Sequence, residues 1–418
     1  MILTKYKLGD ILDVTRGASL SGEFYATKGE YIRLTCGNFD YQNNCFKENK
    51  SKDNLYYVGD FKPEFLMEEG DIITPLTEQA IGLLGSTAII PESGKYIQSQ
   101  DVAKIICNED LLDKDFAFYL ISSALVKQQL SAAAQQTKIR HTSPDKIKDC
   151  TVWIPELAEQ KRIGKLLRSI DRKIELNRAI NQNLEAMAKQ LYDYWFVQFD
   201  FPNEEGKPYK SSGGEMVWNE KLKRMIPKEW TNANIYQLAS ISKETVNPLA
   251  RPNELFKHYS LPEYDKTGTY AEEYGIDIQS AKFTVTNNCI LVSKLNPWTS
   301  RVICGNRESN QICSTEFVVW NPASMKTKGF LFMLAKSAKF IEYCTQGATG
   351  TSHSHRRINP ELMMKFDFSY NSEIAIKFSR LIENIIGKLH DNIAQLKILT
   401  KQRDELLPLL MNGQITIE

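Results

Sequence analysis

One stretch, Glu159 to Phe196, constrains the fold of this chain more than any other. Its apolar residues recur at alternating steps of four and three, so they fall on one stripe of a helix, the a/d seam of a coiled coil. The seam consists of Ile163, Leu167, Ile170, Ile174, Leu184, Ala188, Leu191 and Trp195, with the polar Asn177 and Asn181 between them. At 1.5 Å per residue this helix would be about 55 Å long. We expect so long a helix to bury its stripe only against another long helix.

A second stretch repeats the same pattern 215 residues further along the chain. Its seam consists of Phe378, Ile382, Ile385, Leu389, Asn392, Leu396, Leu399, Arg403, Leu406 and Leu410. Subtracting 215 returns the first seam position for position, and Asn392 falls on Asn177. A buried Asn at one seam position costs stability but fixes register and pairing. The matched register therefore favours a related pair of helices over two long helices that merely look alike.

The composition limits the class of protein. A chain of 418 residues is expected to hold two or three domains, each with its own core. Lys and Arg number 52 against 51 Asp and Glu, so any nucleic-acid contact must come from local clusters of basic residues. The eight cysteines stand singly, no signal peptide is evident, and no apolar run approaches the ~18 residues of a membrane span. We expect a soluble cytoplasmic protein with reduced thiols.

The rest of the chain predicts two related α/β domains. In the first, short apolar runs bounded by Gly and Pro predict buried strands, and the residues that follow Asp115 have helical spacing. A stretch rich in Gly, Pro, Ser and charge predicts a connector. The predicted parts are a first domain at 1–155, a central helix at 156–200, the connector at 201–229, a second domain at 230–370 and a C-terminal helix at 371–418.

Segments of the two domains correspond in the same order. YIQSQDVAKII matches QICSTEFVVW, and FAFYLISSALVKQQL matches FLFMLAKSAKFIEYC. QQTKIRHTSPDKI matches GATGTSHSHRRINPELM, which places Arg356 on Arg140 and Pro360 on Pro144. The fold we predict is therefore an α/β (α+β) tandem repeat with pseudo-twofold character, in which two globular domains are separated by two long helices of a coiled coil.

Familiar catalytic motifs do not occur in the sequence. It contains no GxxxxGK[ST] phosphate loop, no GxGxxG after a strand, no HExxH and no GxSxG. SKLNPWT, at 293–299, loosely resembles the Asn-Pro-Pro-aromatic signature of amino-methyltransferases, but Trp298 replaces the second Pro and no glycine-rich loop precedes it. The His pair of SHSHRR has neither carboxylates nor cysteines nearby, which favours a solvated basic loop over a metal site. We predict a protein without catalytic residues or a metal.

Basic and aromatic residues gather in the predicted loops. Arg and Lys contact guanine edges or phosphates and Asn contacts adenine, whereas a single such residue is more often an ordinary solvated charge. The collective pattern is more specific, because TKIRH and SHSHRR lie at equivalent places, each before a Pro and a returning strand. The candidate DNA-binding residues are Arg16, Arg33, Asn38, Lys138, Arg140 and His141 in the first domain, and Lys294, Trp298, Arg301, His353, His355, Arg356 and Arg357 in the second.

Four stretches carry a resemblance to a known family. They are the helix WIPELAEQKRIGKLLRSIDRKIELNRAINQNLE, the connector LYDYWFVQFDFP with GKPYKSSGGEMVWNEKLKRMIPKEW, the opening KYKLGDILDVTRG and the ending QRDELLPLLMNGQI. Together they resemble the specificity (S) subunits of type I restriction–modification systems over essentially the whole chain. The DNA-reading loops match nothing transferable, because these domains vary between members of the family.

The resemblance implies a non-catalytic DNA-binding subunit. Two target-recognition domains, joined by antiparallel spacer helices, would each read one half of a bipartite DNA site. Two methyltransferase (M) subunits would bring S-adenosylmethionine and methylate adenine, and two restriction (R) subunits would bring ATP- and Mg-dependent translocation and cleavage for host defence. The chain itself would hold no cofactor. We expect the M subunits to dock on the outer helix faces and near Trp195 and Phe196, where we predict an exposed aromatic cluster.

Two other functions remain open at this point. The first is an assembly scaffold, whose globular domains bind proteins while the coiled coil sets their distance. The second is a stand-alone methyltransferase, which the missing cofactor loop argues against. Only a DNA reader would enrich a gapped sequence from a DNA library.

Overall fold

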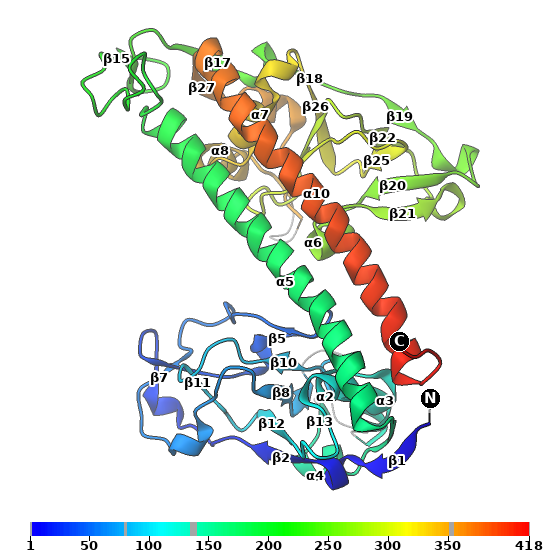
Figure 1. Ribbon diagram of the computed structural model, residues 1–418. Helices are drawn as coiled ribbons and strands as arrows, with labels where there is room; N and C mark the ends of the chain where they lie inside the picture. The colour runs from blue at the N-terminus through cyan, green and yellow to red at the C-terminus, as the bar shows by residue number, and fades with distance from the viewer. Residues whose placement is uncertain (1, 79–81, 134–139, 351–354, 418) are drawn as a thin grey trace. The chain divides into compact units, whose positions relative to one another are not determined.

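The computed structural model describes residues 2–78, 82–133, 140–350 and 355–417. The chain divides into two compact units, which we call unit 1 (residues 1–174 and 398–418) and unit 2 (residues 175–397). Each unit is a mixture of sheets and helices and contains part of two long helices, α5 (Leu157–Tyr192) and α10 (Ser372–Met411), as Figure 1 shows. No helix among the described residues is both long enough and apolar enough to cross a membrane.

In both long helices the predicted apolar stripe faces the hydrophobic core of the unit. In unit 1, Ile163 and Leu167 of α5 and Leu410 of α10 belong to the hydrophobic core. In unit 2, Phe378 and Ile382 of α10 lie in that unit's core together with the end of α5. The expectation that the stripe is buried only against another helix was therefore wrong at both ends, where the globular units cover it. None of the predicted seam residues is exposed: Ile163, Leu167, Ile170, Ile174, Ile382, Ile385 and Leu389 are buried, and Asn177, Leu184, Leu191, Asn392, Leu396, Leu399 and Leu406 are half-buried.

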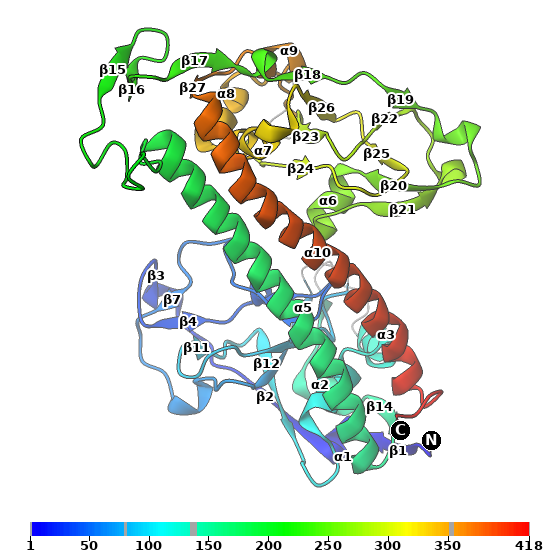
Figure 2. The ribbon, with the colours of Figure 1, turned by 45° about the horizontal axis from the view of Figure 1, so that its top comes forward.

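The middle of the helix pair is polar and antiparallel. Within unit 2, Asn177 Nδ2 donates to Gln395 Oε1 at 3.2 Å, and Asn392 Nδ2 donates to Asn181 Oδ1 at 2.9 Å. Moving four residues forward on α5 thus moves the partner three residues back on α10, as antiparallel helices require. Within each unit the segments of the two helices lie side by side in both views (Figures 1 and 2), and the hydrogen bonds within unit 2 confirm the predicted antiparallel arrangement.

The described residues of unit 1 form two four-stranded sheets. Their strand orders are β10-β8-β12-β2 and β11-β4-β7-β3, and shorter pairs join β1 to β14, β9 to β13 and β5 to β6. The strands are β1 (Thr4–Lys7), β2 (Leu12–Arg16), β3 (Tyr25–Ala26), β4 (Tyr31–Arg33), β5 (Phe39–Asp40), β6 (Cys45–Phe46), β7 (Tyr56–Tyr57), β8 (Ile72–Pro75), β9 (Thr77–Glu78), β10 (Ala88–Ile89), β11 (Tyr96–Ile97), β12 (Val102–Cys107), β13 (Arg140–His141) and β14 (Thr151–Ile154). The short helices are α1 (Leu8–Ile11), α2 (Lys114–Ile121), α3 (Ala124–Ala133) and α4 (Pro144–Lys148).

Two main sheets also occur in the described part of unit 2. Their strand orders are β18-β26-β23-β24 and β19-β22-β25-β20-β21, and β15 pairs with β16 and β17 with β27. The strands are β15 (Met216–Asn219), β16 (Arg224–Pro227), β17 (Thr231–Asn234), β18 (Ala239–Ile241), β19 (Thr245–Val246), β20 (Leu255–Tyr259), β21 (Ala271–Tyr274), β22 (Lys282–Thr284), β23 (Ile290–Ser293), β24 (Val302–Cys304), β25 (Gln311–Cys313), β26 (Phe317–Pro322) and β27 (Asp367–Tyr370). The helices are α6 (Leu261–Thr267), α7 (Lys328–Ala335), α8 (Ala338–Gln346) and α9 (Pro360–Met364).

The two units share one framework. The order β10-β8-β12-β2 recurs as β24-β23-β26-β18, the pair β1-β14 recurs as β17-β27, and α2, α3 and α4 recur as α7, α8 and α9. Successive side chains of a strand point to opposite faces. Accordingly, Ile72 of β8 and Val292 of β23 lie in the cores that also hold the long helices, whereas Ile73 and Leu291 lie in the cores beside the second sheets. The predicted tandem repeat is confirmed.

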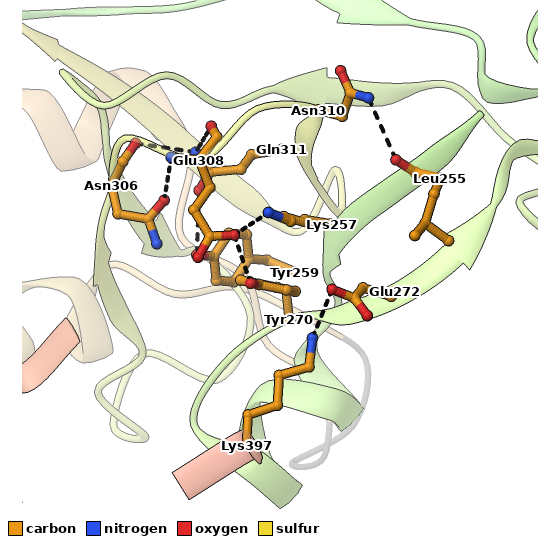
Figure 3. Close-up of polar contacts among 10 residues, drawn as sticks. All are labelled: Leu255, Lys257, Tyr259, Tyr270, Glu272, Asn306, Glu308, Asn310, Gln311 and Lys397. Carbon is orange, nitrogen blue, oxygen red and sulfur yellow. Dashed lines mark hydrogen bonds and ion pairs between the residues drawn. The ribbon is translucent and has the colours of Figure 1, made fainter. Parts of the chain in front are cut away.

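The second sheets differ between the units. Both contain a parallel pair, β4 with β11 and β20 with β25, but the strands around it do not correspond. In unit 2, Lys397 Nζ of α10 lies 3.0 Å from Glu272 Oε1 of β21 and 4.4 Å from the centroid of the Tyr270 ring (Figure 3). Tyr270 donates in turn to Glu308, which pairs with Lys257. This network ties α10 to the edge of the second sheet of unit 2.

The predicted connector is folded, which its composition concealed. Strands β15 and β16 form a hairpin, and Phe201 stacks on Tyr209 and Trp230, with ring centroids 4.8 and 5.2 Å away. At the end of α5, a π-helical turn carries Trp195 and Phe196, whose side chains are only 6% and 4% exposed. The prediction of an exposed aromatic cluster there was wrong, because both rings pack against Phe378.

Candidate nucleic-acid interface

Both units bring the predicted basic segment to the same place on the framework. In unit 1, β8 continues into β9, which pairs with β13, and Thr142 N donates to Leu76 O at 2.9 Å. In unit 2, the residues that follow β23 pair with the segment before α9, and Ile358 N donates to Lys294 O at 3.0 Å. The residue that follows each basic segment therefore hydrogen-bonds to the residues just after β8 in unit 1 and just after β23 in unit 2, which are matching strands of the framework sheets.

In unit 2 this loop gathers several candidate residues. Asn296, at a positive φ of 48°, turns the chain, and its N–H donates to Arg356 O at 2.7 Å. Arg356 N donates back to Asn296 Oδ1, and Arg356 Nη2 donates to Ala348 O at 2.6 Å. Trp298 is 43% exposed at the outer turn, Lys294 is half-buried, and His355 is exposed. The structure thus brings together Lys294, Trp298, Arg301, His355, Arg356 and Arg357.

Two arginines of this cluster are held by carboxylates. Arg357 forms a bidentate pair with Glu316, with Nε–Oε2 and Nη2–Oε1 both at 3.0 Å. Arg301 forms a bidentate pair with Asp265 of α6, with Nε–Oδ1 at 2.6 Å and Nη2–Oδ2 at 2.8 Å. Two parallel N–H···O bonds fix the plane and direction of a guanidinium. Both arginines are therefore oriented before any ligand arrives.

In unit 1 two candidate residues, Arg16 and His141, lie near the adjacent residues Gln100 and Asp101. Arg16, at the exposed end of β2, donates from Nε to Gln100 O at 2.8 Å. Thr77 Oγ1 lies 3.4 Å from Asp101 Oδ1 and 3.2 Å from Nδ1 of the exposed His141. The candidate interface of unit 1 therefore also contains a carboxylate, that of Asp101, and the Thr77 hydroxyl lies between this carboxylate and the His141 ring.

Arg33 and Asn38 lie elsewhere and are buried. The guanidinium of Arg33 stacks over the Tyr25 ring at 3.8 Å from its centroid, and Arg33 is 7% exposed. Asn38, 2% exposed, accepts from Thr35 N and donates to Lys47 O. The structure gives these two side chains packing and capping contacts, and neither is placed to contact DNA in this conformation.

Three further candidates cannot be placed fully. Lys138 and His353 lie outside the described residues. Arg140 is placed only by its backbone, which pairs with Glu78 across β13 and β9. Their contact with DNA, like that of the clustered residues above, stays a prediction.

The carboxylates Asp101, Asp265 and Glu316 were not among the predicted site residues, because the prediction used only basic, aromatic and amide side chains. A signal for two of them was present. Asp101 and Glu316 occupy the same position in the matched stretches YIQSQDVAKII and QICSTEFVVW. Asp265 has no counterpart of this kind, and only the folded structure brings it to Arg301.

Comparisons with known proteins agree on one family. A family model described as the type I restriction modification DNA specificity domain matches residues 3–186. The type I restriction enzyme MjaIX specificity subunit of Methanocaldococcus jannaschii is 22% identical, over 75% of this chain and 72% of that protein. The type I restriction enzyme HindI specificity subunit of Haemophilus influenzae is 23% identical, over 77% of this chain and 81% of that protein.

A solved structure supports the fold across the whole chain. The crystal structure of a type I restriction–modification system S subunit from M. genitalium covers 98% of this chain and 96% of that chain, with a TM-score of 0.63 and 14% sequence identity. At this identity the likeness concerns the fold, which includes the repeated framework and the two long helices. The family model and the curated relatives together lead to one conclusion: residues 3–186 match the type I restriction modification DNA specificity domain, and the chain is similar over about three quarters of its length to specificity subunits of type I restriction enzymes.

Proposed function

We propose that this chain reads a bipartite DNA site, with one half-site for each unit, and that its paired helices set the gap between the half-sites. One observation carries the proposal. The residue that follows the basic segment attaches to the same framework position in both units through equivalent hydrogen bonds, Thr142 N to Leu76 O and Ile358 N to Lys294 O. A duplicated framework with different loops suits a protein that reads two different short sequences.

The chemistry of the loops suits DNA. Guanidinium groups bind guanine edges or phosphates, and an exposed indole such as that of Trp298 offers an apolar face to a base or sugar. The net charge of the chain is only +1, so binding depends on these local clusters rather than on a general attraction to polyanions. The proposed DNA contacts are Arg16 and His141 in unit 1 and Lys294, Trp298, Arg301, His355, Arg356 and Arg357 in unit 2.

The helices also offer a surface for partners. Leu176, Ile180 and Met187 lie at helical spacing on one face of α5 and are 61%, 38% and 51% exposed. Apolar residues exposed along one face of a helix indicate an interaction surface. We propose that methyltransferase subunits dock on the long helices here, in place of the Trp195–Phe196 region, whose rings are buried.

The catalytic chemistry in this proposal belongs to partner subunits. Two methyltransferase subunits supply S-adenosylmethionine and modify adenine, and two restriction subunits supply the chemistry that depends on ATP and Mg. The chain contributes binding and spacing, and it is not itself an enzyme. Its place of action is the cytoplasm, where the host DNA is found.

Selection from a random DNA library tests the proposal. The full-length chain, alone and mixed with methyltransferase subunits of a type I system, is incubated with random duplexes, and the bound duplexes are sequenced. We expect enrichment of two short sequences separated by a constant gap. Enrichment of a single uninterrupted site, or of no sequence, would contradict the proposal. Binding of proteins without any selection of DNA would instead favour an assembly scaffold.

A further inference from the structure

A carboxylate stands at the same framework position in both units. Leu76 N donates to Asp101 O at 2.8 Å in unit 1, and Lys294 N donates to Glu316 O at 2.9 Å in unit 2. Asp101 lies just before β12 and Glu316 just before β26, which are matching strands of the framework. The correspondence between the two carboxylates therefore rests on backbone hydrogen bonds as well as on sequence.

In unit 2 the carboxylate determines which edge of an arginine is presented. Glu316 accepts from Nε and Nη2 of Arg357, and the backbone N–H of Arg357 is fixed by a 2.8 Å bond to Thr349 O. A guanidinium carries five N–H donors, so three remain, including both on Nη1. Side-chain exposure is 44% for Arg357 and 26% for Glu316, so the carboxylate lies deeper and the arginine outside it. Bidentate reading of guanine needs two such donors in a fixed direction.

In unit 1 the hydroxyl of Thr77 connects the carboxylate of Asp101 to the basic side chain of His141. Asp101 Oδ1 accepts from Thr77 Oγ1 at 3.4 Å, and Thr77 Oγ1 lies 3.2 Å from His141 Nδ1. When Nδ1 carries the proton, the ring donates to Thr77, which donates to Asp101, and Nε2 is the ring nitrogen left to contact a ligand. His141 pairs with Thr77 across β13 and β9, as Arg357 pairs with Leu295 in unit 2. The two basic residues are thus equivalent.

We propose that Asp101 and Glu316 are positioning residues that set the sequence preference of their own half-site by orienting His141 and Arg357. This inference rests on the proposed function. A free guanidinium turns toward whichever phosphate is nearest, which strengthens binding to all sequences alike. A guanidinium held by a carboxylate gains less from a phosphate and keeps the direction needed to read a base edge. Each carboxylate thereby lowers the affinity for DNA of any sequence and increases the discrimination between sequences.

The test compares Glu316→Gln with wild type in the full-length chain. Dissociation constants are measured over a range of salt concentrations for the selected site, for sites altered in either half, and for unrelated DNA. We expect Glu316→Gln to lower discrimination by about tenfold for bases of the unit 2 half-site only. Binding to unrelated DNA should strengthen, and its salt slope should rise by up to about one. Asp101→Asn should have the corresponding effect on the other half-site.

Glu272→Gln is the matched control, because it removes the same charge and one ion pair, that with Lys397, within unit 2. It should leave the discrimination of both half-sites unchanged. Thermal unfolding of each variant shows whether the fold is retained, and Asp101→Asn tests the inference independently if Glu316→Gln fails to fold. Folded variants with wild-type discrimination and salt slope, or with equal loss at both half-sites, would overturn the inference. A wild-type chain that selects no sequence would overturn the proposed function itself.

Discussion

The two units pack against their parts of α5 and α10 through different kinds of side chain, polar in unit 1 and apolar in unit 2. In unit 1, Tyr119 Oη of α2 donates to Asp171 Oδ2 of α5 at 2.5 Å, and Arg403 Nη1 of α10 donates to Asp171 Oδ1 at 3.3 Å. The positions in unit 2 that match Tyr119, Asp171 and Arg403 in sequence are occupied by Met333, Ile386 and Ala188, all within an apolar core. One framework therefore accepts either a buried polar triad or a packed apolar set.

The difference shows which part of the framework is constrained. The polar triad is satisfied internally: burial and the charge of Asp171 raise the pKa of Tyr119, which keeps its hydroxyl protonated as a donor. A buried charge pair often contributes little net stability, yet removing one member leaves an uncompensated charge. The side chains at these positions must fill the space and leave no polar group without a partner. Either a polar triad or apolar residues can do this.

Breaking the polar triad should have the largest effect on stability. Asp171→Ala leaves Arg403 buried without the carboxylate on α5, although Arg403 keeps its contact with Asp404. We expect a loss of about 3–5 kcal/mol in the free energy of unfolding, measured with urea.

The control transplants the apolar set of unit 2. The triple variant Tyr119→Met, Asp171→Ile, Arg403→Ala should be less destabilised than Asp171→Ala, because replacing a whole buried ion pair by apolar residues is often neutral or stabilising by about 1–4 kcal/mol. A triple variant at least as unstable as the single one would show that the two chemistries are not interchangeable at this place.

The seam residues should respond alike in both units. Ile174 and Leu389 occupy matched positions and are 2% and 7% exposed. Substitution of each by Ala removes buried methyl groups, and we expect each to cost about 2–5 kcal/mol in urea unfolding. A cost below about 1 kcal/mol for either residue would mean that its half of the seam is loosely packed.

The DNA-facing loops should respond separately. Arg357→Ala should weaken binding through the unit 2 half-site by about 1–3 kcal/mol if the side chain contacts a base. A phosphate contact would instead lower affinity for all sequences and reduce the salt slope by about one. His141→Ala, the matched change in unit 1, should affect only the other half-site. If both substitutions leave affinity and salt slope unchanged in titrations, neither residue contacts DNA.

The polar centre of the helix pair should have the smallest effect on stability. Asn392→Leu removes a 2.9 Å hydrogen bond to the half-buried Asn181. We expect a change of less than about 1 kcal/mol in unfolding, because an apolar residue also suits the seam. Looser register should appear as faster amide hydrogen exchange in the middle of α10. A loss above about 3 kcal/mol would show that this bond is essential to pairing.

Much of the framework could be predicted from the sequence. Buried helices and strands leave periodic apolar patterns, so FAFYLISSALVKQQL and FLFMLAKSAKFIEYC indicated α2–α3 and α7–α8. The seam indicated the long helices for the same reason. Both patterns are local, and the repeat doubled the evidence for each.

The rest depended on contacts between distant residues. The burial of Arg33 rests on the Tyr25 ring, and a basic residue in a predicted loop ordinarily faces water. The Gly, Pro and Ser content of the connector concealed aromatic rings that meet only when the chain folds back on Trp230. Asp265 was recognisable only once the structure placed it beside Arg301.

Each unit is proposed to read one half-site, and the helix pair is proposed to set the gap between the two half-sites. Deleting Asn177–Asn183 together with His390–Leu396 removes facing heptads, since Asn177 bonds to Gln395 and Asn181 to Asn392. The seam stays in phase. The pair shortens by about 10 Å at 1.5 Å per residue. DNA rises about 3.4 Å per base pair, so the selected gap should shrink by about three base pairs.

Site selection from a random library with this shortened chain is the most direct measurement. We expect unchanged half-site sequences, a gap shorter by about three base pairs and some loss of affinity, because one half-site is rotated relative to the other. Lys397→Ala is the control, since the deletion also displaces Lys397 from Glu272. The control should keep the original gap. Recovery of the original gap at the original affinity by the shortened chain would show that the helix pair does not set the spacing.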